Sequence, residues 1–312
     1  MAGRMLTIRA LTPIHSGYGQ ESGALDQPVV REMITGWPYL NGERIKGVLR
    51  DACNNDPDLK DYAKHKDGPF YRLFGPPTSD ARDYAGALIF SDAFLLCFPV
   101  RSFFGTFAWI TCPLALQRWK DDCVALGDAA SIPLPSRPPG DGRIFVPNGP
   151  LELEESALVG PEGLQSVFLE EFKLQPVQAA QDRDFIRTLA QSIAGRAFAA
   201  DAWAARFTSR FGIVSDDLFT RLVEAFTIRA ARIRLDEESK TVANGALWYE
   251  EDVPQQAIFA APVRLNTRRY AGNDAWQPIE TAIAQPIQIG GNKTVGRGFI
   301  RLQLAAADGG GQ

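Results

Sequence analysis

The sequence has few residues of the kinds that hold metal ions or form disulfides. Its 312 residues include four cysteines and two histidines, His15 and His65. The cysteines form no Cys-x-x-Cys pair and lie far apart, at Cys53, Cys97, Cys112 and Cys123. Because structural zinc needs clustered ligands, this spacing argues against a zinc site, and we expect no structural disulfide. A nuclease that relies on two histidines within one subunit is also excluded.

Long apolar runs are absent as well. No segment approaches the roughly 18 apolar residues that a membrane helix needs. The first residues, 1–9, lack the apolar stretch and cleavage site of a signal peptide and are typical of the start of a strand. We therefore expect a cytoplasmic protein with no membrane partner.

An excess of positive charge is also missing, since the formal net charge is -4 and the pI is about 5.4. This balance alone argues against nucleic-acid binding, which needs Lys and Arg at phosphates. The charges are unevenly spread, however. Residues 151–172 are acidic, and basic residues gather near the C-terminus, at Arg264, Arg268, Arg269, Lys293, Arg297 and Arg301. The sequence thus permits a basic RNA-binding groove without indicating one.

Hydrophobic and turn patterns indicate an α+β fold rather than a doubly wound parallel sheet. Residues 6–11 alternate as in a half-buried strand, and residues 41–52 repeat at helical spacing. Proline and glycine mark residues 128–150 as a loop, and we expect the small, polar tail 305–312 to be flexible. Further segments are expected as core strands at 84–111, mainly helices at 164–226, a long hairpin at about 228–252, a strand at 258–265, a helix at 276–284 and a last strand at 299–304.

The strongest local signal is the glycine-rich loop GGNKTVGRG at 290–298. Its glycines allow close backbone approach, and Lys293 and Arg297 suit phosphate recognition. The spacing is not that of a Walker A loop, and a strand rather than a helix follows, which excludes a dinucleotide fingerprint. A hairpin loop that merely happens to be glycine-rich remains the alternative.

Two further candidates lie in the N-terminal part. Lys46 and Arg50 are four residues apart on one helix face near its start, where anions are attracted, although a solvated face is the simpler interpretation. Asp26 follows a Gly/Ser-rich loop, where an aspartate usually forms a turn or a cap. If the loops meet, Asp26 and His15 could serve proton transfer or hold a metal ion.

Several motifs together resemble the RAMP proteins of CRISPR systems, in particular the backbone subunits of type III-B (Cmr) complexes. In the N-terminal part these are HSG at 15–17, LDQPVVRE at 25–32 and NGERIKGVLR at 41–50. The others are LLCFPVRS at 95–102, FAWITCP at 107–113, RIRLDEE at 232–238, NGALWYE at 244–250 and IGGNKTVGRG at 289–298. They span nearly the whole chain, so chance is a poor explanation.

The resemblance implies a single RAMP domain over 1–312 with an RRM-like (ferredoxin-like) palm, a loop and helical insertion at about 113–227, and the hairpin at about 228–252 as a protruding thumb. It implies guide crRNA, target RNA, stacked copies of the chain and other Cmr subunits as partners. Asp26 would cut target RNA at regular intervals with Mg²⁺ or Mn²⁺ bound to it, and His15 would assist. Guide binding would fall on Lys46, Arg50, Arg101, Ser102, Gly290, Gly291, Asn292, Lys293, Thr294, Gly296, Arg297 and Gly298.

Three other functions stay open on the sequence. The chain could be a guide-binding scaffold without activity, which does not require Asp26. It could be a RAMP endonuclease that processes the guide precursor, with His15 as general base. It could also be a mononucleotide-binding enzyme that uses the glycine-rich loop.

Overall fold

The strand predicted at the N-terminus lies inside an eight-stranded sheet. In the computed structural model, β1 (Ala2–Ala10) pairs antiparallel with β11 (Ile258–Leu265) on one side and β13 (Phe299–Leu304) on the other. The structure describes residues 2–17, 25–59, 68–76, 80, 83–127, 132, 134–135, 137–147, 156–160, 165–177, 180–198, 202–235 and 242–305. His65 and most of the tail, residues 306–312, lie outside these described residues.

The sheet order is β12-β13-β1-β11-β3-β4-β8, with β2 paired to β11. Its other strands are β2 (Leu88–Phe90), β3 (Phe94–Arg101), β4 (Phe107–Thr111), β8 (Phe211–Ile213) and β12 (Ile287–Gln288). All pairs within it are antiparallel except β4 with β8. The α+β prediction is confirmed.

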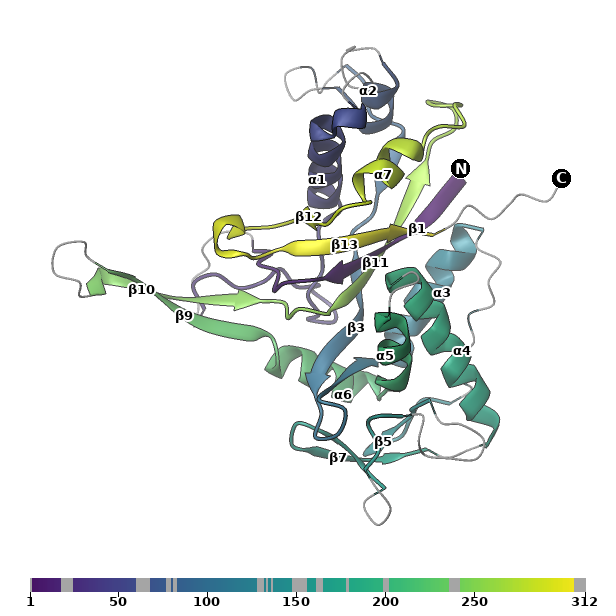
Figure 1. Ribbon diagram of the computed structural model, residues 1–312, viewed down its shortest axis with the longest axis vertical. Coiled ribbons are helices and arrows are strands. Elements are labelled where there is room, and N and C mark those ends of the chain that lie inside the picture. Colours follow the sequence, from purple (N-terminus) through teal and green to yellow (C-terminus); the bar gives the residue numbers. More distant parts are fainter. Residues whose placement is uncertain are drawn as a thin grey trace.

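Alternating side chains of β1 feed two apolar cores on opposite faces of the sheet. Leu6 and Ile8 pack into the first core, and Met5 packs into the second. Helix α1 (Gly42–Asn55) contributes Ile45 and Leu49 to the first core. The helices of this face are α1, α2 (Pro69–Phe74), α6 (Asp216–Ala225) and α7 (Gln277–Ala282), and those of the other are α3 (Pro113–Ala125), α4 (Ala180–Ala197) and α5 (Trp203–Ser209) (Figure 1).

Helix α1 starts where the sequence predicts it, because Asn41 caps it. The Asn41 side chain accepts a hydrogen bond from the amide of Glu43 at 2.9 Å. The Asp92 carboxylate accepts a second one from the amide of Gly42 at 2.7 Å. Both bonds satisfy amides that an α-helix leaves without partners at its start.

The region 164–226, predicted as mainly helical, also contains strands. β6 (Val167–Leu169) and β7 (Phe172–Pro176) form a hairpin, which β5 (Arg143–Ile144) extends within the expected 128–150 loop. β8 joins the main sheet beside β4. Strands of two to five residues are too short for a period of two to distinguish them from loops, so tertiary pairing decides.

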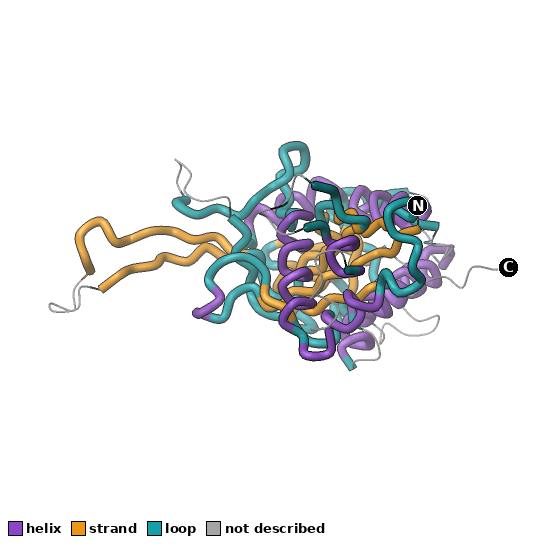
Figure 2. Tube along the Cα trace, turned by 90° about the horizontal axis from the view of Figure 1, so that it is seen from above, coloured by secondary structure: helices purple, strands orange, loops and turns teal. Residues whose placement is uncertain are grey.

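The predicted hairpin forms from β9 (Ile228–Leu235) and β10 (Val242–Asp252), with its turn outside the described residues. It projects from the body as a long arm (Figures 1 and 2). The described residues also include short 3₁₀ helices at Pro57–Leu59 and Lys293–Val295. None of the helices in the described part of the chain combines the length and apolar character needed to span a bilayer.

Candidate functional site

Asp26 lies beside the root of the protruding hairpin. The segment around it runs along β10, where the amide of Gln27 donates to the Tyr249 carbonyl at 3.1 Å and the amide of Glu251 donates to the Gln27 carbonyl at 3.0 Å. The Asp26 carboxylate accepts a hydrogen bond from the amide of Tyr249 at 2.8 Å. The residue is exposed. The Asp26 carboxylate is therefore accessible to solvent beside the hairpin root.

His15 docks on the same strand a few residues further along. Its ring Nδ1 lies 2.9 Å from the Glu251 carbonyl and 3.4 Å from the Asp252 carboxylate. The Asp252 carboxylate raises the pKa of His15 above 6.5, against the opposing effect of burial. The ring is largely buried. β10 thus brings the two predicted catalytic residues to neighbouring positions, with His15 held on a carboxylate of its own.

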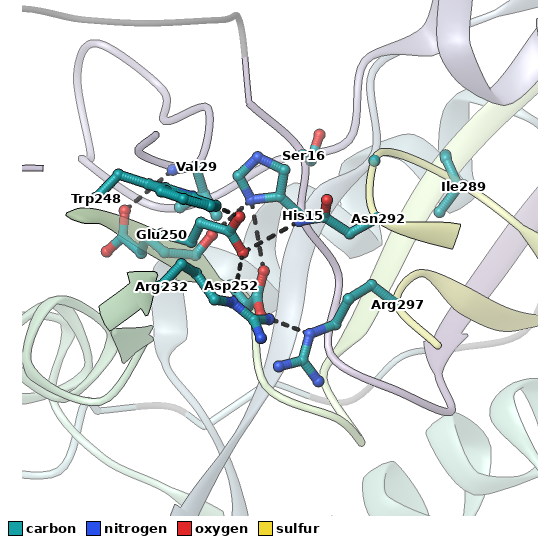
Figure 3. Close-up of polar contacts among 12 residues, drawn as sticks. His15, Ser16, Val29, Arg232, Trp248, Glu250, Asp252, Ile289, Asn292 and Arg297 are labelled. Carbon is teal, nitrogen blue, oxygen red and sulfur yellow. Dashed lines mark hydrogen bonds and ion pairs between the residues drawn. The ribbon is translucent and has the colours of Figure 1, made fainter. Parts of the chain in front are cut away.

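Three consecutive buried acids, Glu250, Glu251 and Asp252, form what we call the carboxylate cluster. Successive side chains of a strand point to opposite sides. Glu250 and Asp252 face the glycine-rich loop and the hairpin: Glu250 accepts from Trp248, Arg232 and Asn292, and Asp252 pairs with Arg297 at 3.0 Å (Figure 3). Paired in this way, the acids avoid the large cost of an unpaired buried charge.

Glu251 faces the other way, toward the segment that carries Asp26. Its carboxylate accepts from Arg31 at 2.6 Å, from the Thr227 hydroxyl at 2.6 Å and from the amide of Val29 at 3.1 Å. Burial alone would raise the pKa of Glu251, but these donors outweigh it and lower the pKa below its ordinary value of 4.5. Glu251 is therefore held as a carboxylate at neutral pH.

The glycine-rich loop is compact and held against the residues that precede Asp26. The amide of Gly291 donates to the His15 carbonyl at 3.0 Å, and the amide of Gly298 donates to the Pro13 carbonyl at 2.8 Å. Gly290 and Gly298 both have positive φ, and a Cβ there would collide with backbone oxygens. The amides of Gly291, Val295, Gly296, Arg297 and Gly298 all donate within the protein. Phosphate recognition by this loop would therefore use side chains such as Lys293 more than these amides.

Lys46 and Arg50 line one cavity of about 580 Å³ between α1 and α2, together with Arg269 and Tyr84. The Arg50 guanidinium lies over the rings of Phe70 and Tyr71 and donates to the Pro76 carbonyl at 3.0 Å. Burial and the charge of Arg50 lower the pKa of Lys46 below 10.5. Such a concentration of positive charge favours an anionic ligand. Arg269 joins the predicted pair Lys46 and Arg50 in this cavity, although the sequence indicated it only as one of several basic residues near the C-terminus.

Arg101 and Ser102 lie at the end of β3, apart from that cavity. The Arg101 side chain is 78% exposed and pairs with Glu170 at 2.9 Å. Ser102 is buried, and its amide donates to the Thr106 carbonyl at 3.0 Å. The predicted RNA-binding residues are therefore distributed over three places, namely the α1 cavity, the glycine-rich loop and the β3 end.

The RAMP superfamily profile matches residues 7–301, almost the whole chain. The chain belongs to the RAMP superfamily. A relative from Pyrococcus furiosus, named CRISPR system Cmr endoribonuclease Cmr4, is 35% identical over 309 residues, covering 97% of this chain and 96% of the relative. The predicted resemblance is confirmed.

Solved structures agree with this RAMP assignment. Oligomeric Cmr4 from Pyrococcus furiosus superposes with a TM-score of 0.70 at 26% identity, covering 98% of this chain and 99% of that one. A chain of a type III-B Cmr-beta complex bound to cognate target RNA has the same TM-score, 0.70, at 19% identity and 97% coverage of both chains, which shows the shared fold.

Sequence reasoning missed the contacts of this RAMP protein's carboxylate cluster. Glu250 and Glu251 stood at the end of the predicted hairpin, and neither was assigned a role. A run of three acids in a strand is itself a signal, because burying them requires dedicated partners. Those partners, among them Arg31, Thr227 and Arg297, lie far away in sequence and could not be paired with the acids by pattern alone.

Proposed function

We propose that this chain is the repeating backbone subunit of a type III-B CRISPR effector complex and that it cuts target RNA paired to a guide. The observation that carries the proposal is the exposed Asp26 carboxylate, fixed at 2.8 Å to the amide of Tyr249 at the root of the hairpin. The relative named an endoribonuclease supports RNA cleavage, and a chain of the Cmr-beta complex bound to target RNA has the same fold. Neighbouring copies and other Cmr subunits would then flank the chain.

Guide binding would use the positive groups, with sequence read by base pairing between guide and target. Lys46 and Arg50, joined by Arg269 in the α1 cavity, suit the guide backbone. Lys293 of the glycine-rich loop and Arg101 at the β3 end add positive groups at two other places. The hairpin, projecting from the body, would separate a guide–target base pair and expose the target linkage near Asp26.

In the reaction we propose, the 2′-hydroxyl of the target attacks the adjacent phosphorus. Asp26 accepts the hydroxyl proton as general base, the bond from phosphorus to the 5′-oxygen breaks, and that oxygen gains a proton from solvent. The products are a 2′,3′-cyclic phosphate and a 5′-hydroxyl. His15, which is held by Asp252 of β10, would assist by keeping the root of the hairpin beside Asp26 in place.

The divalent metal ion expected at Asp26 stays a prediction. Within the described residues, no group of three or more His, Cys, Asp or Glu is placed to hold a metal ion. The described part of one chain thus does not fit a metal held by protein ligands alone, and no step above depends on one. Cleavage measured with Mg²⁺, with Mn²⁺ and with a chelator tests the requirement directly.

The deciding experiment compares the assembled complex carrying wild type or Asp26→Asn on a guide-complementary RNA. We expect regularly spaced cuts with wild type, and their loss in the variant with guide and target binding intact. Unchanged cuts would instead make the chain a non-catalytic scaffold. Cleavage within repeat RNA by the chain alone would favour processing of the guide precursor, and a 5′-phosphate on the downstream product would exclude attack by the 2′-hydroxyl.

A further inference from the structure

The Glu251 side chain lies beneath the segment that carries Asp26, with only 2% of its surface exposed. Its own amide donates to the Gln27 carbonyl at 3.0 Å. Its carboxylate accepts from the next part of the same segment, from the amide of Val29 and the guanidinium of Arg31. Glu251 of β10 therefore binds every second residue of the segment, at positions 27, 29 and 31.

These contacts continue the short ladder that fixes Asp26. The ladder consists of the bonds from Tyr249 to the Asp26 carboxylate, from Gln27 to the Tyr249 carbonyl and from Glu251 to the Gln27 carbonyl. Beyond Gln27 the segment turns away from β10, and main-chain pairing to the strand ends. From there the Glu251 carboxylate takes the place of the strand's backbone as the acceptor.

The same carboxylate also binds the start of the hairpin. The Thr227 hydroxyl, immediately before β9, donates to it at 2.6 Å, and Arg31 and Thr227 share one of its oxygens. Glu251 thereby joins the Asp26 segment, β10 and the entrance to β9 at one buried point. A displacement of the hairpin relative to Asp26 would have to break these bonds.

We propose that Glu251 is a positioning residue for RNA cleavage, which holds the Asp26 carboxylate in register with the hairpin that presents the target linkage. The proposal rests on the proposed function. Glu251 is too deeply buried to touch RNA, so it acts through the segment 26–31 and not on the reacting atoms. Geometry of this kind governs rate, since a misplacement of about 1 Å can cost about a hundredfold.

The role needs a carboxylate and not only its shape. Three donors converge on two oxygens: Val29 on Oε2, and Arg31 and Thr227 on Oε1. Glutamine keeps the size but offers one acceptor oxygen, and its amide nitrogen would face a donor. Glu251→Gln should therefore release part of the segment while leaving the guide-binding groups of α1 and of the glycine-rich loop unchanged.

The test measures single-turnover cleavage by the assembled complex at saturating target, together with the Kd for guide and target. For Glu251→Gln we expect a rate lower by roughly tenfold to a hundredfold, with both Kd values unchanged. Glu280→Gln is the matched control, because Glu280 lies in a half-exposed ion pair with Arg4 away from the hairpin, and it should cut as wild type does. A wild-type rate for Glu251→Gln, or weaker binding with an unchanged rate at saturation, would overturn the inference.

A second pair of variants keeps the test decisive if Glu251→Gln fails to assemble. Thr227→Val removes one donor to Glu251 at nearly constant volume, whereas Thr227→Ser keeps the hydroxyl. We expect slower cleavage with valine and recovery with serine, and equal rates for the two would reject the positioning role. Wild type and Asp26→Asn run in parallel. If wild type does not cut, or if Asp26→Asn cuts equally, the proposed function has failed. If Asp26→Asn is inactive while Glu251→Gln and Thr227→Val cut at the wild-type rate, the positioning role alone has failed.

Discussion

Gly296 and Gly298 share a positive φ but not their surroundings, so they allow strain and collision to be separated. Their φ angles are 80° and 78°. A Cβ at Gly296 would meet nothing within 4 Å, whereas a Cβ at Gly298 would collide with the Ile289 carbonyl oxygen. Alanine at the first position tests the cost of positive φ alone. Alanine at the second also forces the β12–β13 connection to move.

The expected losses follow from these contacts. A non-glycine residue in the left-handed region costs about 1–2 kcal/mol, which is the whole effect expected for Gly296→Ala. At Gly298 the displaced backbone also loses two hydrogen bonds of 2.8 Å, from its amide to Pro13 and from Ile289 to its carbonyl. At about 1 kcal/mol net for each bond, Gly298→Ala should lower the free energy of unfolding by about 3–4 kcal/mol.

Thermal unfolding of the purified chain measures the difference. With an unfolding entropy of about 2.1 cal/mol/K per residue and 312 residues, 1 kcal/mol corresponds to about 1.5 °C in Tm. We expect Tm to fall by about 2–3 °C for Gly296→Ala and by about 5–6 °C for Gly298→Ala. Equal shifts in the two variants would refute the assignment of the Gly298 requirement to close backbone approach.

Two further predictions concern pH. The folded pKa of His15 is raised above 6.5, so its pairing with Asp252 stabilises the fold below that pH, and this stabilisation is lost as pH rises through the folded pKa. The Tm difference between wild type and His15→Gln should therefore shrink from acidic to alkaline buffer. A Tm difference that stays constant with pH would contradict this role of His15. For Glu32, burial would raise the pKa, but Arg118 and Thr35 outweigh it and lower the pKa below 4.5, so its stabilisation is present above 4.5 and lost as pH falls. Urea unfolding should show Glu32→Gln less stable than wild type by about 1 kcal/mol at neutral pH and equal to it in acid, because the pair with Arg118 is partly exposed and screened.

Elements with strong local signals could be predicted from the sequence. The helix α1 follows from a capping asparagine and apolar residues at helical spacing, and Ile45, Leu49 and Cys53 are all buried in it. The hairpin and the glycine-rich loop are likewise predicted by the pattern of the residues within them. β8 was missed because it has three residues, all buried, and its status as a strand depends on pairing with β4.

The candidate site is less predictable because one strand end gathers segments from across the chain. The end of β10 and the residue after it, together 249–253, form hydrogen bonds to Ile14, to the Asp26 segment and to the glycine-rich loop. Because side chains alternate along β10, Glu250 and Asp252 contact the glycine-rich loop, whereas Glu251 contacts the segment that carries Asp26. The sequence separations exceed two hundred residues for the N-terminal partners. Local patterns can therefore identify Asp26 as a candidate, but only the fold shows that its position depends on the root of the hairpin.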